Sequence, residues 1–124
     1  MAVVEVVKEN FRFVRGDTFT RYFSIKKIEN SPITQIYYTI KEDQDRKALV
    51  IKTLGNGIEL LNEDEERCHY ALTLNCTCTD RLKAETPYMH DIQVVRGEYK
   101  RTLMKGQVYL EKEATTTHCE REVK

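Results

Sequence analysis

Hydrophobic and polar residues alternate with a period of two along most of this chain. Residues 19–26 place three apolar side chains on one face of an extended strand and polar side chains on the other, and Arg21 interrupts the apolar face. Residues 33–41 repeat the alternation. Because successive side chains of a β-strand point to opposite faces of a sheet, both segments predict half-buried strands.

Further strand patterns follow at residues 48–53, 58–61, 68–74, 88–96, 99–105 and 107–112. Gly55-Asn56-Gly57 is a strong turn signal, and Gly106 is expected to separate the last two strands. Residues 79–84 predict one short helical turn capped by Thr79. Seven to nine short strands at intervals of about 8–12 residues, with almost no helical periodicity, predict an all-β antiparallel sandwich.

The tripeptide Arg15-Gly16-Asp17 lies between two of these patterns. Gly adopts the backbone angles of a tight bend without steric cost, and Asp can hydrogen-bond its own backbone. Gly16 and Asp17 are therefore predicted to form a turn that sets the strand register. Animal integrins bind the same tripeptide, but that function needs an exposed loop on a secreted protein.

The charge and length of the chain narrow its class. Its 124 residues fit one domain, which we expect to comprise an N-terminal arm (1–9), a β-sandwich (10–113) and a flexible C-terminal tail (114–124). Twenty basic and 20 acidic residues give a formal net charge of zero, which argues against nucleic acid or an anionic membrane as partner. The N-terminus lacks a signal-peptide pattern, and no segment approaches the length of a membrane span.

Candidate chemistry is sparse, and the sequence predicts no enzyme, cofactor or metal. His90 and Asp91 are neighbours in a strand, so their side chains point to opposite faces and cannot work as an acid–base pair. We expect Asp91 to hydrogen-bond a neighbouring turn and His90 to be partly exposed. The spacing of Cys76, Cys78, His118 and Cys119 fits a zinc site poorly, and we expect Cys68 and these three cysteines to be free thiols.

Several segments resemble a known family when they are taken in order. They are Arg15-Gly16-Asp17-Thr18, Tyr38-Thr39-Ile40-Lys41, Tyr88-Met89-His90-Asp91-Ile92-Gln93-Val94 and Thr102-Leu103-Met104-Lys105-Gly106. This series resembles the N-terminal domain of phage baseplate upper proteins and related small phage tail proteins, over residues 10–112. The resemblance implies an immunoglobulin-like β-sandwich and a place in the virion after assembly in the bacterial cytoplasm.

Two functions follow as hypotheses. The first is a structural component of a phage or prophage tail or baseplate, with other tail proteins and copies of itself as partners. Aromatic residues are enriched at interfaces, so Tyr22, Tyr37 and Tyr99 are the predicted contact residues. The alternative is a free-standing immunoglobulin-like module that binds a carbohydrate or a host protein. Trp, a frequent sugar-stacking residue, is absent from the chain.

Overall fold

The computed structural model describes residues 6–43 and 45–114. This part of the chain forms nine strands and one short helix. In chain order they are β1 (Val7–Lys8), β2 (Phe11–Val14), β3 (Phe19–Lys26), β4 (Gln35–Lys41), β5 (Ala48–Leu54), β6 (Gly57–Glu63), β7 (Arg67–Leu74), α1 (Cys76–Asp80), β8 (Pro87–Arg96) and β9 (Tyr99–Glu111). The predicted all-β class is confirmed.

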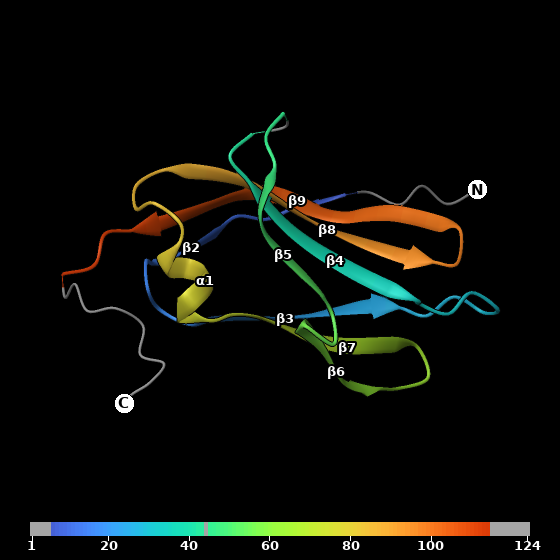
Figure 1. The fold of residues 1–124 in the computed structure, drawn as a ribbon. Helices are drawn as coiled ribbons and strands as arrows, with labels where there is room; N and C mark the ends of the chain where they lie inside the picture. The colour runs from blue at the N-terminus through green and yellow to red at the C-terminus, as the bar shows by residue number, and fades with distance from the viewer. Residues whose placement is uncertain (1–5, 44, 115–124) are drawn as a thin grey trace.

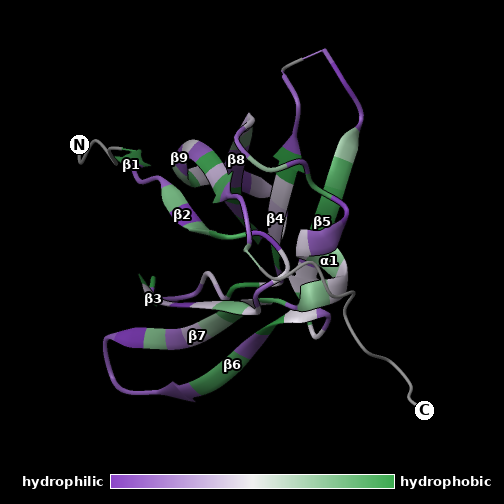
Figure 2. Ribbon diagram, turned by 90° about the vertical axis from the view of Figure 1, so that its left-hand side faces the viewer, coloured by the Kyte–Doolittle hydropathy of each residue, from purple (hydrophilic) through white to green (hydrophobic). Residues whose placement is uncertain are grey.

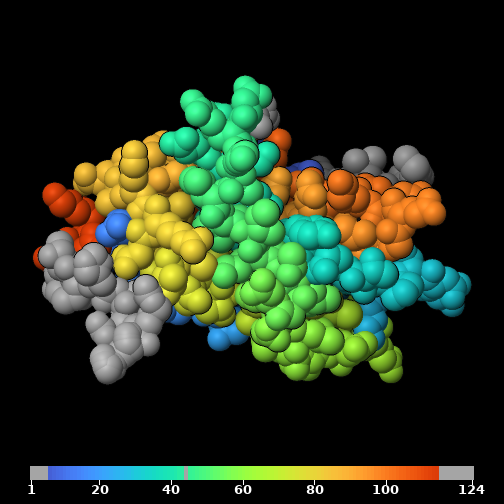
Figure 3. Space-filling model, in the orientation of Figure 1, coloured from blue at the N-terminus to red at the C-terminus, as the bar shows by residue number. Residues whose placement is uncertain are grey.

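The strands form two packed layers, which Figures 1 and 2 show from two directions. The strands are hydrogen-bonded along one path, β1-β9-β8-β4-β5-β6-β7-β3, with β2 also on β9. This path folds between β5 and β6, so that β1, β2, β9, β8, β4 and β5 form one layer, here called the front sheet (upper in Figure 1), and β6, β7 and β3 form the other, called the back sheet. The chain passes from one layer to the other between β5 and β6, where Thr53 and Leu54 pair with Gly57 and Ile58. The β4–β5 hairpin projects beyond the rest of the molecule (Figure 3).

The sandwich is mixed and not wholly antiparallel, because β1 and β2 both run parallel to β9. The other pairings within each sheet are antiparallel. A parallel pair needs a long connection between its strands, and here almost the whole domain separates β2 from β9. Local sequence therefore gives no sign of this pairing.

Apolar side chains from both sheets fill the space between the layers. On β4 the alternation is as predicted: Ile36, Tyr38 and Ile40 are fully buried, whereas Tyr37 is exposed. The core also holds Ile58, Leu72 and Leu74 from the back sheet and Ile92, Val94, Val108 and Leu110 from the front sheet.

Tyr88 lies at the start of β8. Its ring is buried, and its hydroxyl accepts a hydrogen bond from the backbone N–H of Lys83, five residues upstream, at 2.8 Å. A tyrosine at this corner that bonds back to the chain before it is a hallmark of immunoglobulin-type sandwiches. Together with the two-layer strand order, it identifies an immunoglobulin-like fold.

The predicted helical turn lies a few residues earlier than expected. The helix spans Cys76–Asp80, and Asn75 caps it, with its side-chain oxygen accepting from the backbone N–H of Cys78 at 3.0 Å. Thr79 is not the cap. It is fully buried, where its hydroxyl donates to the Asp17 carbonyl at 3.0 Å and accepts from the Gly16 N–H at 3.1 Å.

Gly106 does not end a strand, because β9 continues through it. It pairs with His90, and a side chain at this position would overlap the Glu9 carbonyl group and approach the Asn10 side chain. A glycine inside a strand often marks such a close approach of another backbone segment. The residue is needed for packing of the β1–β2 segment and makes no turn.

The predicted terminal segments and cysteines have mixed outcomes. Val7 and Lys8, assigned to the arm, pair with Met104 and Lys105 of the front sheet. Most of the predicted tail lies outside the described residues. Cys68 and Cys78 are free thiols as expected, but Cys76 is disulfide-bonded. Within the described residues, α1 is too short to cross a membrane and no longer helix is present.

Candidate functional site

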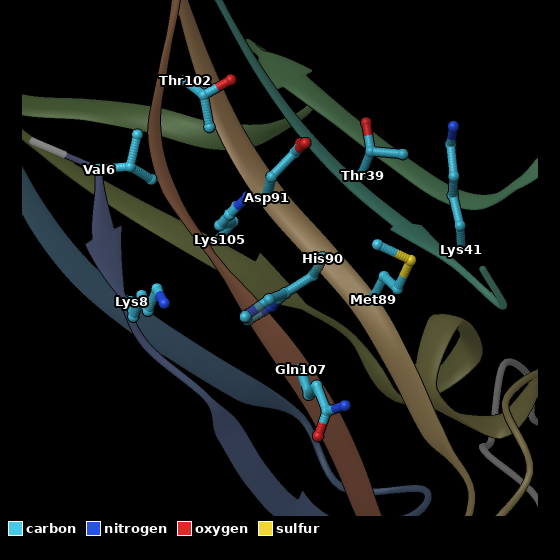
Figure 4. Close-up of a pocket in the computed structure, with 11 residues that line it drawn as sticks. Val6, Lys8, Thr39, Lys41, Met89, His90, Asp91, Thr102, Lys105 and Gln107 are labelled. Carbon is cyan, nitrogen blue, oxygen red and sulfur yellow. The ribbon is translucent and has the colours of Figure 1, made fainter. Parts of the chain in front are cut away.

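A depression of about 560 Å³ lies on the outer face of the front sheet. Its lining comes from the start of the described chain and from β1, β4, β8 and β9 (Figure 4). We call it the concave face. Asp91 lies in the middle of the residues drawn in Figure 4, with Lys8, Lys41 and Lys105 among those around it. Val6 and Met89 add apolar surface.

Strand register brings these side chains together. Asp91 on β8 pairs with Thr39 on β4 and with Lys105 on β9, and Lys105 pairs with Lys8 on β1. Directly paired residues of neighbouring strands share a face. The four residues therefore form one row across the sheet, and Lys41 lies one outward position further along β4.

The concave face has an excess of positive charge. Three lysines and one carboxylate line it, and within the described residues none of these lysines makes an ion pair. Burial raises the pKa of Asp91 above its usual range, while Lys41 and Lys105 partly offset that effect. A carboxylate from outside would find unpaired ammonium groups here beside apolar surface.

His90 lies under this face, inside the core, and the expectation that it is partly exposed is wrong. Only 3% of its surface is accessible. Its Nε2 lies 2.8 Å from the Glu9 carbonyl, which can only accept, so Nε2 carries the proton and donates. Its Nδ1, 2.9 Å from the Tyr38 hydroxyl, then accepts. Burial lowers the pKa of His90, with the Glu9 hydrogen bond acting in the opposite direction.

Asp91 does not lie beside a turn as expected. It faces outward in the middle of the front sheet, because His90 next to it takes the inward position. The two side chains point to opposite faces, as predicted. The arrangement provides binding groups on the surface and a structural hydrogen-bond centre beneath it.

The three predicted contact tyrosines are exposed but do not share a surface. Tyr37 is on the outer face of β4, Tyr22 is on β3 in the back sheet, and Tyr99 opens β9 at the β8–β9 hairpin. Their exposed fractions are 38%, 64% and 72%. Their role in contacts stays a prediction, and if they act, they act at separate places.

The Arg15-Gly16-Asp17 segment is a turn packed against the chain around α1. Gly16 has a φ of 90°, and the Asp17 N–H donates to the Val14 carbonyl at 3.1 Å. Arg15 donates to the carbonyls of Leu82 at 2.7 Å and Asp80 at 2.5 Å, and also contacts Glu113. These contacts bury much of the arginine, so the segment acts as a structural turn.

The described residues contain no group of three or more side chains suited to hold a metal ion. Two members of the zinc set considered from the sequence, His118 and Cys119, lie outside the described residues. The sequence did not reveal that the lysines of the concave face lie together, because strand order and register decide which residues are neighbours, and local patterns do not show either. The outward parity of Lys41, Asp91 and Lys105 was the only available signal.

Comparisons with known proteins support the fold. No family model and no curated protein matches the chain. A solved structure from work on cell-adhesive interactions of VGSC beta subunits has 8% identity and a TM-score of 0.50, covering 93% of this chain and 99% of that one. A structure of the NK cell receptor Nkp44 has 11% identity and a TM-score of 0.48, covering 88% and 99%. At this identity the first likeness shows the immunoglobulin-like fold alone.

Proposed function

We propose that this protein is a protein-binding module that uses the concave face of its front sheet. The carrying observation is the depression itself, in which three unpaired lysines surround a half-buried carboxylate beside apolar side chains. Concave surfaces that combine apolar lining with a few convergent polar groups are favoured binding sites. The site holds no nucleophile with a base beside it, which favours binding over catalysis.

The charge of the face indicates the chemistry of the partner. Lys8, Lys41 and Lys105 outnumber Asp91, so an acidic side chain next to an apolar one complements the surface. Exposed lysines mainly steer association and make it sensitive to salt. Met89, with 36% of its surface exposed, supplies adaptable apolar contact.

A protein partner is favoured over a carbohydrate. Sugar sites commonly use aromatic faces, whereas none of the residues that line this depression is aromatic apart from buried His90. The phage tail or baseplate, with the virion as location, is one setting for such a module. That setting rests on the sequence resemblance and stays a prediction.

Comparative capture tests the proposal. Wild-type protein, Lys105→Glu and the matched control Lys100→Glu would each be immobilised and exposed to extract and culture fluid of the source organism. Lys100 lies on the same strand as Lys105 but outside the depression. It also faces outward, because the register shift between Ile92 and Gln93 leaves Leu103 without a partner on β8 and changes the alternation of β9 at that point. Circular dichroism would first establish that all three are folded.

We expect one or more proteins to be retained by wild type and Lys100→Glu and to be reduced about tenfold on Lys105→Glu, as quantified by mass spectrometry. Retention that is equal on the two variants would refute the concave face as the binding surface. The identity of the retained proteins decides the setting, because phage tail proteins among them would support the predicted virion role.

A further inference from the structure

A second surface lies on the open side of the sandwich, between β3 and β9. β3 is the last strand of the back sheet and pairs only with β7 among the described strands. Its register with β7 is unbroken over all eight residues. An edge strand without a bulge presents unpaired backbone groups to another extended segment.

On this open side, the segment around β1 and β2 covers the first half of β3. Phe13 of β2 stacks on Phe19 with ring centres 4.5 Å apart, and Arg21 pairs with Glu9 at 2.5 Å. Beyond Arg21 the two sheets leave a cavity of about 600 Å³. Figure 1 shows this end of β3 on the same side of the molecule as the β8–β9 hairpin. We call this cavity the slot.

Backbone geometry shows which groups of β3 face outward along the edge. Lys27 donates its N–H to Glu66 on the β7 side, whereas the Lys26 carbonyl accepts from the Arg96 side chain at 2.8 Å, on the opposite side. In an antiparallel pair, the backbone N–H and C=O groups of successive residues point alternately toward the partner strand and away from it. Ser24 and Tyr22 therefore share the direction of Lys26 and offer two N–H and two C=O groups to an added strand.

The slot has a specific chemical lining. Ile25, Val94 and Leu103 form apolar walls, and Ile28 and Tyr99 stand at its rim with 56% and 72% of their surfaces exposed. Its charged members are Lys26, Arg96 and Arg101, and no acidic residue lines it. Arg101 makes no hydrogen bond or ion pair with any described residue.

We propose that the edge of β3 and the slot form a docking site for an extended segment of a partner protein that alternates apolar and polar residues and carries a carboxylate. The segment adds a strand to the back sheet at Tyr22 and Ser24. Its apolar side chains enter the slot, and its carboxylate pairs with Arg101. This site goes beyond the concave face and does not depend on it.

The pairing is short, and this sets the expected affinity. Two β3 residues offer four backbone hydrogen bonds, far fewer than the roughly ten of a standard protein interface. The segment thus gains specificity from the slot and binds weakly by itself, with a dissociation constant on the order of micromolar or weaker. An assembly with many copies would make such a contact effective.

Selection from a displayed library of random ten-residue peptides tests this docking site. The immobilised baits are wild type, Ser24→Pro, Arg101→Glu, the concave-face variant Lys105→Glu and the control Lys100→Glu. Proline at position 24 removes an edge N–H that β7 does not use and adds bulk to the edge. Arg101 and Lys100 are consecutive residues on opposite faces of β9, so the two charge reversals differ only in their relation to the slot.

We expect the enriched peptides to show period-two apolar residues with Asp or Glu. They should bind Lys100→Glu like wild type and should bind Ser24→Pro and Arg101→Glu at least tenfold more weakly. No enrichment, or binding that either Ser24→Pro or Arg101→Glu retains at the wild-type level, would overturn the proposal. Peptides lost only with Lys105→Glu would overturn it too, while supporting the concave face. Wild-type dimerisation that Ser24→Pro abolishes would assign the edge to a second copy and overturn the choice of partner.

Discussion

Tyr38→Phe should destabilise the protein although it removes a single oxygen atom. The Tyr38 hydroxyl donates to Nδ1 of His90 at 2.9 Å, and both residues are almost inaccessible to water. Without that hydroxyl, Nδ1 keeps no donor in a place that water cannot reach. A buried acceptor left unpaired costs about 1–3 kcal/mol. For a domain of this size, each kcal/mol lowers the melting temperature by about 4 °C.

The neighbouring Tyr37 supplies the control. Tyr37→Phe makes the same chemical change one residue away, but this side chain lies on the outer face and is 38% exposed. Surface substitutions usually stay within about 0.5 kcal/mol of wild type. Urea titrations followed by circular dichroism at pH 7.5 would give the free energy of unfolding of wild type and both variants.

Two results would refute this reasoning. If Tyr38→Phe unfolds with the same free energy as Tyr37→Phe, the buried hydrogen bond contributes nothing to stability. The second test is the proton position on His90, which nitrogen NMR of the imidazole ring can report. A proton on Nδ1 at neutral pH would contradict the assignment, because the Glu9 carbonyl requires the donor to be Nε2.

Three further predictions concern pH, packing and the turn. Because the folded protein protonates His90 less readily than the unfolded chain does, stability should fall as the pH drops below the ordinary histidine value of 6.5, and His90→Gln should reduce this slope in urea titrations. Gly106→Ala should lower the melting temperature by several degrees, since overpacking against Glu9 costs about 1–3 kcal/mol; an unchanged value would contradict the close approach. Arg15→Lys should cost about 1–2 kcal/mol, since an ammonium cannot span the Leu82 and Asp80 carbonyls together, and equal calorimetric melting temperatures would count against this role.

Local alternation was enough to predict most of the strands and the faces of their side chains, although it missed β1 and divided β9 at Gly106. On β8 the alternation even places His90 on the inner face with Tyr88 and Ile92. The expectation of partial exposure came from the polarity of the imidazole. Its hydrogen-bond partners explain the difference, because Tyr38 and Glu9 lie 52 and 81 residues away. No local pattern shows that a buried polar group will be satisfied by residues so distant.

Both proposed surfaces depend on strand order and register, which the sequence did not show. Lys8, Asp91 and Lys105 lie far apart in the chain and share one row only because β1, β8 and β9 are neighbours in one register. The slot exists because β3 ends the back sheet while β2 covers only its first half. The turn at Gly16 could be predicted since its cause is local, whereas a binding surface made by several strands appears only once the sheet is assembled. The charge reversals at Lys100, Arg101 and Lys105 use this difference. The three residues lie within six positions of one strand, yet the sheet places Lys105 in the concave face, Arg101 in the slot and Lys100 outside both.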